Sequence, residues 1–144
     1  MIDDICLNVI PIKMQLKALF DVHVEVCTNG KQGLDRYIED ISKACCRSYF
    51  HLILMDLNMP MMSGYDSATK IHEIYDQISK EPGYEHLPEP IIFAVSANLN
   101  EDARRDALQS KMVEFLSKPL KKEELRAAVE RRLDCSLLKR LKKY

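Results

Sequence analysis

The sequence lacks the features that mark membrane, secreted and metal-chelating proteins. No apolar run approaches the ~20 residues that a membrane span needs, and no signal peptide opens the chain. The five cysteines and four histidines show neither a CxxC motif nor a pair with metal-ligand spacing. We therefore expect a cytoplasmic protein without direct membrane insertion, whose cysteines are reduced thiols that mostly pack.

The chain also lacks an excess of charge of one sign. Lysine and arginine number 21 against 22 for aspartate and glutamate, so overall charge gives no reason to expect a nucleic-acid partner. Only the C-terminal stretch KRLKKY is locally basic. The 47% apolar and 30% charged residues are ordinary for a globular chain, and 144 residues suit a single core. We assign residues 1–134 to one domain, and residues 135–144 to a basic tail that continues the last helix.

What is present is an alternation of strand and helix patterns from end to end. The strand patterns VHVEVC, FHLILM, IIFAVSA and VEFLS cover 22–27, 50–55, 91–97 and 113–117. Helical patterns follow Asn8, cover 33–44 and about 68–78, begin again at an N-cap Asn100, and resume near Lys121. Strands that alternate with helices predict an α/β protein with a parallel, doubly wound sheet that carries helices on both faces.

Polar residues stand where these strands end, and in such sheets functional groups collect at the carboxyl ends. Three carboxylates, a hydroxyl and an ammonium would therefore meet at one edge: Asp3–Asp4, Asp56, Ser96–Ala97 and Lys118–Pro119. Clustered carboxylates repel one another unless a cation holds them, and oxygen ligands suit Mg²⁺. A lysine and a hydroxyl opposite the metal describe a pocket for a phosphoryl group. Asp56 is then either a metal ligand only or a nucleophile that takes the phosphoryl group itself.

These motifs resemble a known family. Asp3–Asp4, LILMDLNMP around Asp56, AVSA around Ser96 and FLSKP around Lys118 resemble receiver domains of two-component response regulators, and most closely those of hybrid histidine kinases. The resemblance covers essentially the whole chain. It implies a flavodoxin-like fold, a doubly wound parallel five-stranded sheet in the order 2-1-3-4-5. It also implies a Mg²⁺-dependent phosphorelay in which a histidine kinase or histidine phosphotransfer protein donates a phosphoryl group from phosphohistidine.

The resemblance further implies a role for each matching residue. Asp56 would be the phosphoacceptor. Mg²⁺ would be bound by Asp4 directly, by Asp3 through water, and by the backbone carbonyl of Asn58. The remaining roles are phosphoryl stabilisation by Ser96 and Lys118 with the small Ala97 leaving the path open, switching by Phe115 with Ser96, and a cis peptide bond at Pro119. Such a protein is not an enzyme for an external metabolite, although it catalyses its own phosphorylation and dephosphorylation.

The front of the chain departs from the family pattern, because only Met1 and Ile2 precede the acidic pair. The first strand is therefore truncated: either the sequence is clipped there, or the strand is vestigial and the metal ligands are loosely held. This departure favours an alternative function, a pseudo-receiver that acts as a phosphorylation-independent interaction module. An aspartyl-phosphate phosphatase would need a second Asp two residues after Asp56 as its general acid, and that residue is Asn58.

Apolar residues recur every fourth position near the C-terminus, at Leu125, Val129, Leu133, Leu137 and Leu141. A stripe of this kind more often faces a core than a partner, and a weak homodimer is the alternative.

Overall fold

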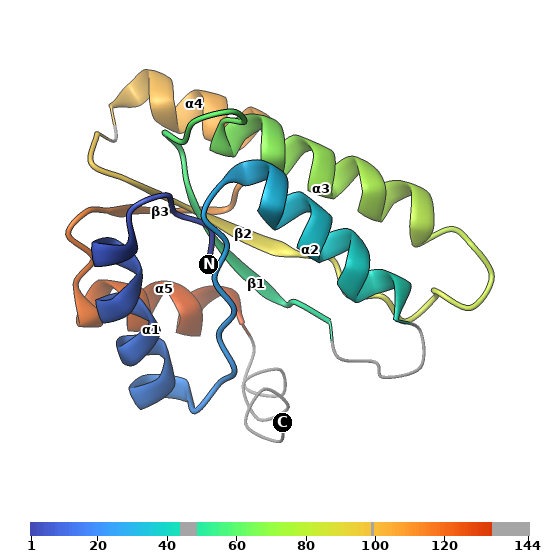
Figure 1. Cartoon of the computed structure of the whole chain (residues 1–144), viewed down its shortest axis with the longest axis horizontal. Helices are drawn as coiled ribbons and strands as arrows, with labels where there is room; N and C mark the ends of the chain where they lie inside the picture. The colour runs from blue at the N-terminus through green and yellow to red at the C-terminus, as the bar shows by residue number, and fades with distance from the viewer. Residues whose placement is uncertain (44–48, 99, 134–144) are drawn as a thin grey trace.

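The computed structural model describes residues 1–43, 49–98 and 100–133, which form five helices and three strands (Figure 1). The described elements follow in the order α1 (Cys6–Phe20), α2 (Gly30–Ser42), β1 (Leu52–Asp56), α3 (Gly64–Ile78), β2 (Ile91–Ser96), α4 (Glu101–Gln109), β3 (Glu114–Ser117) and α5 (Lys122–Arg132). None of these helices is long and apolar enough to cross a membrane.

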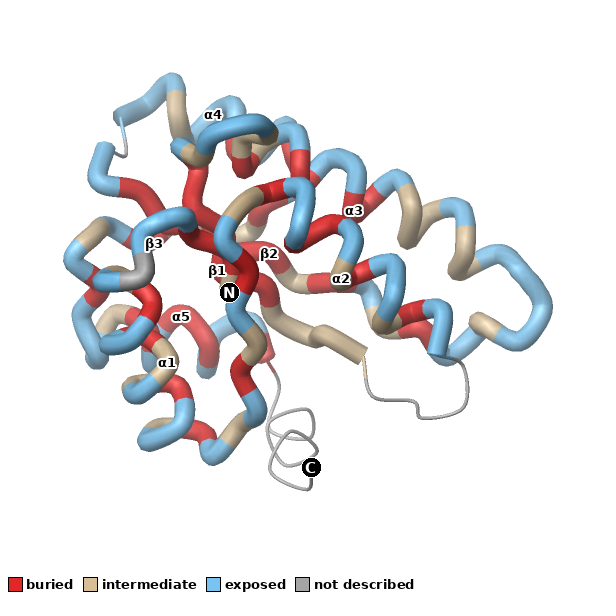
Figure 2. The backbone as a smooth tube through the Cα atoms, viewed as in Figure 1, coloured by how far each residue is buried: buried red, intermediate tan, exposed pale blue. Residues whose placement is uncertain are grey.

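The three strands form one parallel sheet in the order β1-β2-β3, and helices cover both of its faces (Figure 1). Side chains of alternate strand residues point to opposite faces, so the sheet carries two separate cores. On one face Leu54, Phe93 and Leu116 pack with α1 and α5. On the other, Met55 and Ala94 pack with α2, α3 and α4. The tube in Figure 2 shows that most of β1 and β2 is buried between these helical layers. The predicted α/β architecture with a parallel sheet is confirmed; the described residues form three strands, so the predicted five-strand order 2-1-3-4-5 stays a prediction.

The predicted first strand is reduced to Met1–Asp3, yet these residues pair on both sides. Ile2 N–H donates to Leu54 O at 2.8 Å, and Asp56 N–H donates to Ile2 O at 2.9 Å. On the other side Cys27 N–H donates to Met1 O at 2.9 Å, and Asp3 N–H donates to Cys27 O at 3.1 Å. Ile2 thus makes single parallel bridges to Cys27 and to Met55 and lies between them. Three residues are enough to fix the backbone of Asp3 beside β1.

The predicted strand over 22–27 was wrong. The structure keeps this segment outside the sheet ladder except for the bridge at Cys27. The physical reason is the truncated neighbour: a strand needs a row of hydrogen-bonding partners, and Met1–Asp3 supply only a few. The valines at alternate positions give the right pattern, but a pattern cannot supply a missing partner strand.

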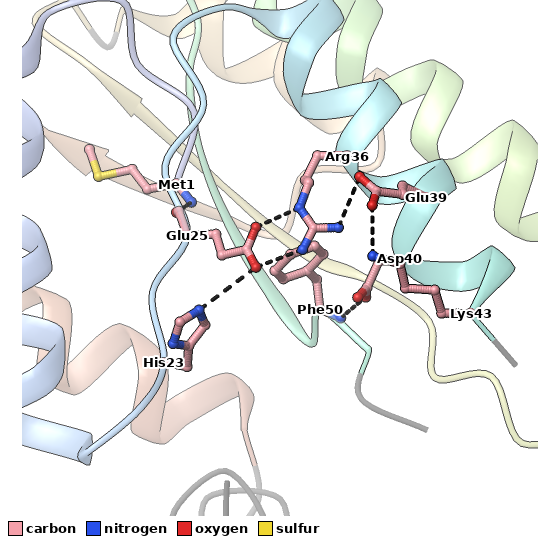
Figure 3. A network of polar contacts seen from close by, with 8 residues as sticks. All are labelled: Met1, His23, Glu25, Arg36, Glu39, Asp40, Lys43 and Phe50. Carbon is pink, nitrogen blue, oxygen red and sulfur yellow. Dashed lines mark hydrogen bonds and ion pairs between the residues drawn. The ribbon is translucent and has the colours of Figure 1, made fainter. Parts of the chain in front are cut away.

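Side chains hold this segment where the ladder does not (Figure 3). The guanidinium of Arg36 on α2 donates two hydrogen bonds to the Glu25 carboxylate, at 2.6 and 2.7 Å. Arg36 also lies over the Phe50 ring, with its Cζ 5.4 Å from the ring centroid. The hydrogen bonds from Arg36 hold the pKa of Glu25 below its ordinary value of 4.5. A bidentate, half-buried ion pair therefore ties the 22–27 segment to α2.

The starts of α1 and α2 differ from the predictions. α1 begins at Cys6 rather than after Asn8, which puts Pro11 in its second turn. α2 begins at Gly30, because the Asn29 side chain caps it by accepting a hydrogen bond from Gln32 N–H at 2.8 Å. The predicted cap at Asn100 is confirmed, with its side chain accepting from Ala103 N–H at 2.8 Å. At the C-terminus α5 ends at Arg132, and the predicted tail over 135–144 lies outside the described residues.

We predict that Glu25→Gln lowers the free energy of unfolding by about 1 kcal/mol at neutral pH, the upper range for a partly exposed ion pair. Because the folded-state pKa of Glu25 lies below its unfolded value, the contribution is complete above pH 4.5 and is lost as pH falls through the folded-state pKa. Urea unfolding as a function of pH measures this difference. Glu39→Gln is the matched control, since Glu39 is an exposed partner of the same arginine. A deficit that persists unchanged in acid would contradict the ion-pair explanation.

Candidate functional site

The carboxyl edge of the sheet brings together the residues that the sequence placed at strand ends. Asp56 is the last residue of β1, Ser96 the last of β2, and Lys118 follows β3 directly. The backbone of Lys118 is fixed there, since its N–H donates to Ser96 O at 2.9 Å. Asp3 reaches the same edge through the short N-terminal pairing. Parallel topology therefore gathers these four residues from segments far apart in the sequence.

The Lys118 ammonium lies between two buried carboxylates. Its Nζ is 2.7 Å from Asp3 Oδ2 and 2.7 Å from Asp56 Oδ2. Both aspartates are almost fully buried, with Asp3 1% and Asp56 5% exposed. Two buried carboxylates this close would repel strongly without a cation. In the described structure, the positive charge of Lys118 thus offsets the repulsion between the Asp3 and Asp56 carboxylates.

Burial and hydrogen bonding act in opposite directions on these groups. Burial raises the pKa of Asp56 above its ordinary value, although hydrogen bonds from Lys118 and from Asn58 N–H oppose the rise. Burial alone would lower the pKa of Lys118, but its hydrogen bonds to Asp3 and Asp56 outweigh that effect and raise it. The lysine is therefore held in its charged form between the two carboxylates.

Three carboxylates at this edge form a donor set for a divalent cation. One carboxylate oxygen each of Asp3, Asp4 and Asp56 lies within 4.8 Å of the others. Asp4 is exposed, while Asp3 and Asp56 are buried, so the set opens to solvent on the Asp4 side. Hard oxygen donors with a solvent-facing side fit Mg²⁺, which retains several of its waters. The donor chemistry present at the site therefore fits this metal.

Hydrogen bonds from amide groups orient two of these carboxylates, those of Asp3 and Asp56. Asp3 Oδ1 accepts hydrogen bonds from Ile5 N–H at 2.9 Å and from Asn8 Nδ2 at 3.3 Å. Asp56 Oδ1 accepts from Asn58 N–H at 3.2 Å. Each of the two aspartates thus has one oxygen held by amide donors and the other turned to Lys118. The sequence analysis did not identify Asn8, whose side chain reaches back from the first turn of α1; its spacing of five from Asp3 gave no signal.

Gly64 sets the shape of the loop that follows Asp56. A Cβ at this position would lie 2.2 Å from Asp56 O and 2.9 Å from Leu57 Cα, which are both backbone atoms that cannot yield. Gly64 N–H also donates to Leu57 O at 3.1 Å, so the loop closes tightly on itself. α3 then begins at Gly64, with Ser63 as its N-cap. The glycine of the MPMMSG stretch is therefore required by the close return of the chain to β1.

The hydroxyl of Ser96 is fully buried and already has polar neighbours. Its Oγ accepts from Asn98 N–H at 3.2 Å and lies 3.4 Å from Asn58 Nδ2 and 3.3 Å from Asn98 O. Ala97 is exposed and has no side-chain bulk beyond its methyl group. A ligand that arrives beside Asp56 would therefore find the Ser96 hydroxyl on the next strand, and would compete with Asn58 and Asn98 for it.

Phe115 lies on β3, paired in register with Ala94, and packs half-buried against the core of α2, α3 and α4. The guanidinium of Arg104 on α4 covers its ring, with Cζ 5.4 Å from the ring centroid. The sequence analysis did not identify Arg104, because a contact between α4 and β3 leaves no local pattern. The Lys118–Pro119 peptide bond is cis.

A parallel sheet covered by helices on both faces, with an acidic site at its carboxyl edge, defines the flavodoxin-like class of α/β domains. The family model described as the response regulator receiver domain matches residues 1–130. The chain belongs to this family.

Known relatives and solved structures agree with this assignment. The chain is 30% identical over 103 residues to the signal transduction histidine-protein kinase BarA of Escherichia coli. The aligned region covers 72% of this chain and 9% of BarA. It is 32% identical over 97 residues to hybrid signal transduction histidine kinase I of Dictyostelium discoideum. That aligned region covers 67% of this chain and 5% of the kinase. The chain thus spans less than a tenth of the length of these relatives.

Among solved structures, the receiver domain of the histidine kinase CKI1 from Arabidopsis thaliana complexed with Mg²⁺ has a TM-score of 0.73 at 26% identity, covering 90% of this chain and 86% of that one. The receiver domain of Ssk1 in its co-crystal structure with Ypd1 from Saccharomyces cerevisiae has a TM-score of 0.73 at 24% identity. The match covers 89% of this chain and 82% of that one.

We predict that Lys118→Met destabilises the metal-free protein by about 3 kcal/mol, the low end for removing one partner of a buried ion pair. Mg²⁺ should restore more stability to this variant than to the wild type, because a metal would then neutralise carboxylates that have lost their lysine. Thermal melts in EDTA and in Mg²⁺ measure both effects. Lys121→Met is the control, since Lys121 is an exposed lysine that pairs with Glu124. Equal Mg²⁺ shifts in wild type and Lys118→Met would show that the metal does not share the site of the lysine.

Proposed function

We propose that the protein is a phosphoacceptor signalling switch that receives a phosphoryl group on Asp56 from a phosphohistidine donor. The observation that carries this proposal is the position of Asp56: a buried carboxylate at the carboxyl end of β1, 2.7 Å from Lys118 and within 4.8 Å of two more carboxylates. A metal cluster alone would not need a lysine between its ligands. A lysine and a divalent cation on one carboxylate are what a transferred dianionic group requires.

The transfer uses groups already in place. A carboxylate oxygen of Asp56 forms a bond to phosphorus as the bond from phosphorus to the imidazole nitrogen of the donor breaks, and the histidine keeps that electron pair. Lys118 then pairs with a phosphoryl oxygen in place of a carboxylate. Asp3, Asp4, Asp56 and the backbone carbonyl of Asn58 would hold Mg²⁺, which supplies charge neutralisation at the phosphoryl oxygens. The protein assists its own modification and its reversal and transforms no external metabolite.

Phosphorylation then acts on Ser96 and Phe115. A phosphoryl oxygen is a stronger acceptor than the carbonyl oxygen of Asn98, to which the Ser96 hydroxyl now donates, so the hydroxyl turns toward Asp56. Ser96 follows Ala94 by two residues on the same face of β2, and Ala94 is the register partner of Phe115. Movement of Ser96 therefore opens room on the face where the Phe115 ring packs. The two-state element is this pair of side chains, biased by the charge added at Asp56.

The donor is a histidine kinase or a histidine phosphotransfer protein, and α1 offers a surface for it. Leu7, Ile10 and Met14 are 81%, 58% and 67% exposed, and their spacing of three and four places them on one stripe of the helix. This stripe begins next to the site, since Asn8 of the same turn contacts Asp3. A donor that brings its histidine to Asp56 would cover the stripe. The Ypd1–Ssk1 co-crystal structure is a precedent for a receiver bound to this class of partner.

The pseudo-receiver alternative depended on a weakened N-terminus. Met1–Asp3 nevertheless pair on both sides, and the Asp3 carboxylate is held by three contacts. These observations support the phosphoacceptor over the pure interaction module.

We predict that acetyl phosphate or beryllofluoride with Mg²⁺ modifies the wild type and that Asp56→Asn abolishes the adduct, because an amide oxygen is a poor nucleophile. Intact-mass spectrometry detects the acyl phosphate, and fluorine NMR detects the beryllofluoride. Asp66→Asn is the control, since Asp66 is an exposed aspartate in the first turn of α3. An adduct that survives in Asp56→Asn would assign the acceptor role elsewhere, and a wild type without an adduct would favour the pseudo-receiver.

We predict that Leu7→Ser with Met14→Ser slows transfer from a phosphorylated histidine phosphotransfer protein such as Ypd1 by about tenfold, while acetyl phosphate labelling stays unchanged. Loss of two exposed apolar contacts at an interface costs on the order of 1–2 kcal/mol. The control is Leu108→Ser, which changes a leucine on α4 that is 59% exposed. Equal slowing by Leu108→Ser would remove α1 from the docking role.

A further inference from the structure

α4 and β3 meet at a surface hollow that holds one aromatic ring. The lining consists of α4 side chains and a single residue of β3: Glu101, Arg104, Arg105, Leu108, Gln109 and Phe115. The ring of Phe115 is therefore half inside the core and half in this hollow. Arg104 lies over the ring at 5.4 Å, a distance at which a guanidinium is attracted to the ring face.

We propose that Arg104 is a latch that holds Phe115 in its resting position and thereby sets how readily the site accepts a phosphoryl group. This inference rests on the proposed function, because the position of Phe115 matters only if Asp56 and Ser96 form a switch. Arg104 contacts neither the carboxylates nor Lys118 in the described structure, so it acts through Phe115 and is a positioning residue.

The two neighbouring arginines of α4 differ in what they bind. Arg105 is committed to carboxylates on its own helix, with Nη2 2.8 Å from Asp102 Oδ1 and Nε 3.9 Å from Asp106 Oδ1. Arg104 makes no ion pair with any residue in 1–43, 49–98 or 100–133, and its guanidinium lies instead over the Phe115 ring. A guanidinium left free of carboxylates in an acidic helix is available to the ring. The hollow thus contains one arginine that holds the ring and one that does not.

The contact between Arg104 and Phe115 would favour the resting state over the phosphorylated state. If the Phe115 ring must leave Arg104 when the phosphoryl group arrives, the contact stabilises only the resting state. Removing it raises the fraction of molecules that are already competent, and the ligand then binds more tightly in proportion. A simple charge effect has the opposite sign, because removal of a cation near an anionic ligand weakens its binding. The sign of the change therefore separates the two mechanisms.

The test uses Arg104→Met, which keeps an apolar cover over the ring and removes the cation. The matched control is Arg105→Met, which removes the same charge from the same hollow without touching the ring contact. The whole chain is labelled with fluorophenylalanine, whose four resonances are few enough to assign, and Phe115→Leu identifies the signal of residue 115. Each protein is titrated with beryllofluoride at saturating Mg²⁺, and both the apparent Kd and the resting chemical shift at Phe115 are recorded.

Arg104→Met should lower the apparent Kd about two- to fivefold, the effect of one partly exposed cation–π contact. Its resting Phe115 resonance should also move toward the position of the bound state, and Arg105→Met should change neither quantity. An unchanged or raised Kd in Arg104→Met, or an equal change in both variants, would overturn the latch while leaving the phosphoacceptor role intact. A wild type that binds no beryllofluoride would overturn the proposed function and the latch with it.

Discussion

The structure depends on one unfavourable feature, the approach of two buried carboxylates at the carboxyl edge of the sheet, and on the lysine that makes it stable. Lys118 can lie between Asp3 and Asp56 only because β3 ends beside β2, where Ser96 O binds the Lys118 amide. Asp3 in turn arrives there through a three-residue strand remnant. The N-terminal segment, β1 and β3 therefore each deliver one charge, and β2 delivers the Ser96 hydroxyl, so the site exists only when the whole sheet is formed. If Lys118 moves away from the carboxylates, they can bind a cation instead, and the lysine can pair with a phosphoryl group. The repulsion between the two carboxylates therefore costs stability but also makes the site able to bind these ligands.

The meeting of Asp3, Asp56 and Lys118 at one edge could be predicted from the sequence, because parallel topology brings strand ends together. Once strands are recognised before Asp56, Ser96 and Lys118, their side chains must meet at one edge. Predictions failed where a structure depends on contacts between elements. The valines of 22–27 indicated a strand, but the neighbouring backbone was too short to pair with it. The contacts of Arg36 with Glu25 and of Arg104 with Phe115 join residues whose separation in sequence carries no periodic signal. Local pattern thus finds the strand ends, while the side chains that lock the elements together require coordinates.

The two surfaces to which the proposals assign a function lie on different sides of the fold. α1 presents its exposed apolar stripe from one helical layer, while α4 and Phe115 belong to the opposite layer (Figure 1). In the proposed scheme a donor occupies the first surface and the response of Phe115 appears at the second. Asp56 and Ser96 connect them through adjacent strand ends. This separation means that a partner that reads Phe115 and a donor bound on α1 would not compete for the same side chains.

The three-residue pairing at the N-terminus has a practical consequence for anyone who handles the protein. The backbone of Met1 pairs with Cys27, and the Met1 nitrogen lies 2.8 Å from Glu25 O. Asp3, whose carboxylate belongs to the site, follows only two residues later. An affinity tag or fluorescent fusion joined at this end would start inside the sheet rather than on a loose arm. A linker there would join backbone that already pairs with Cys27, two residues from Asp3. Purification and labelling strategies should therefore treat the first three residues as part of the site.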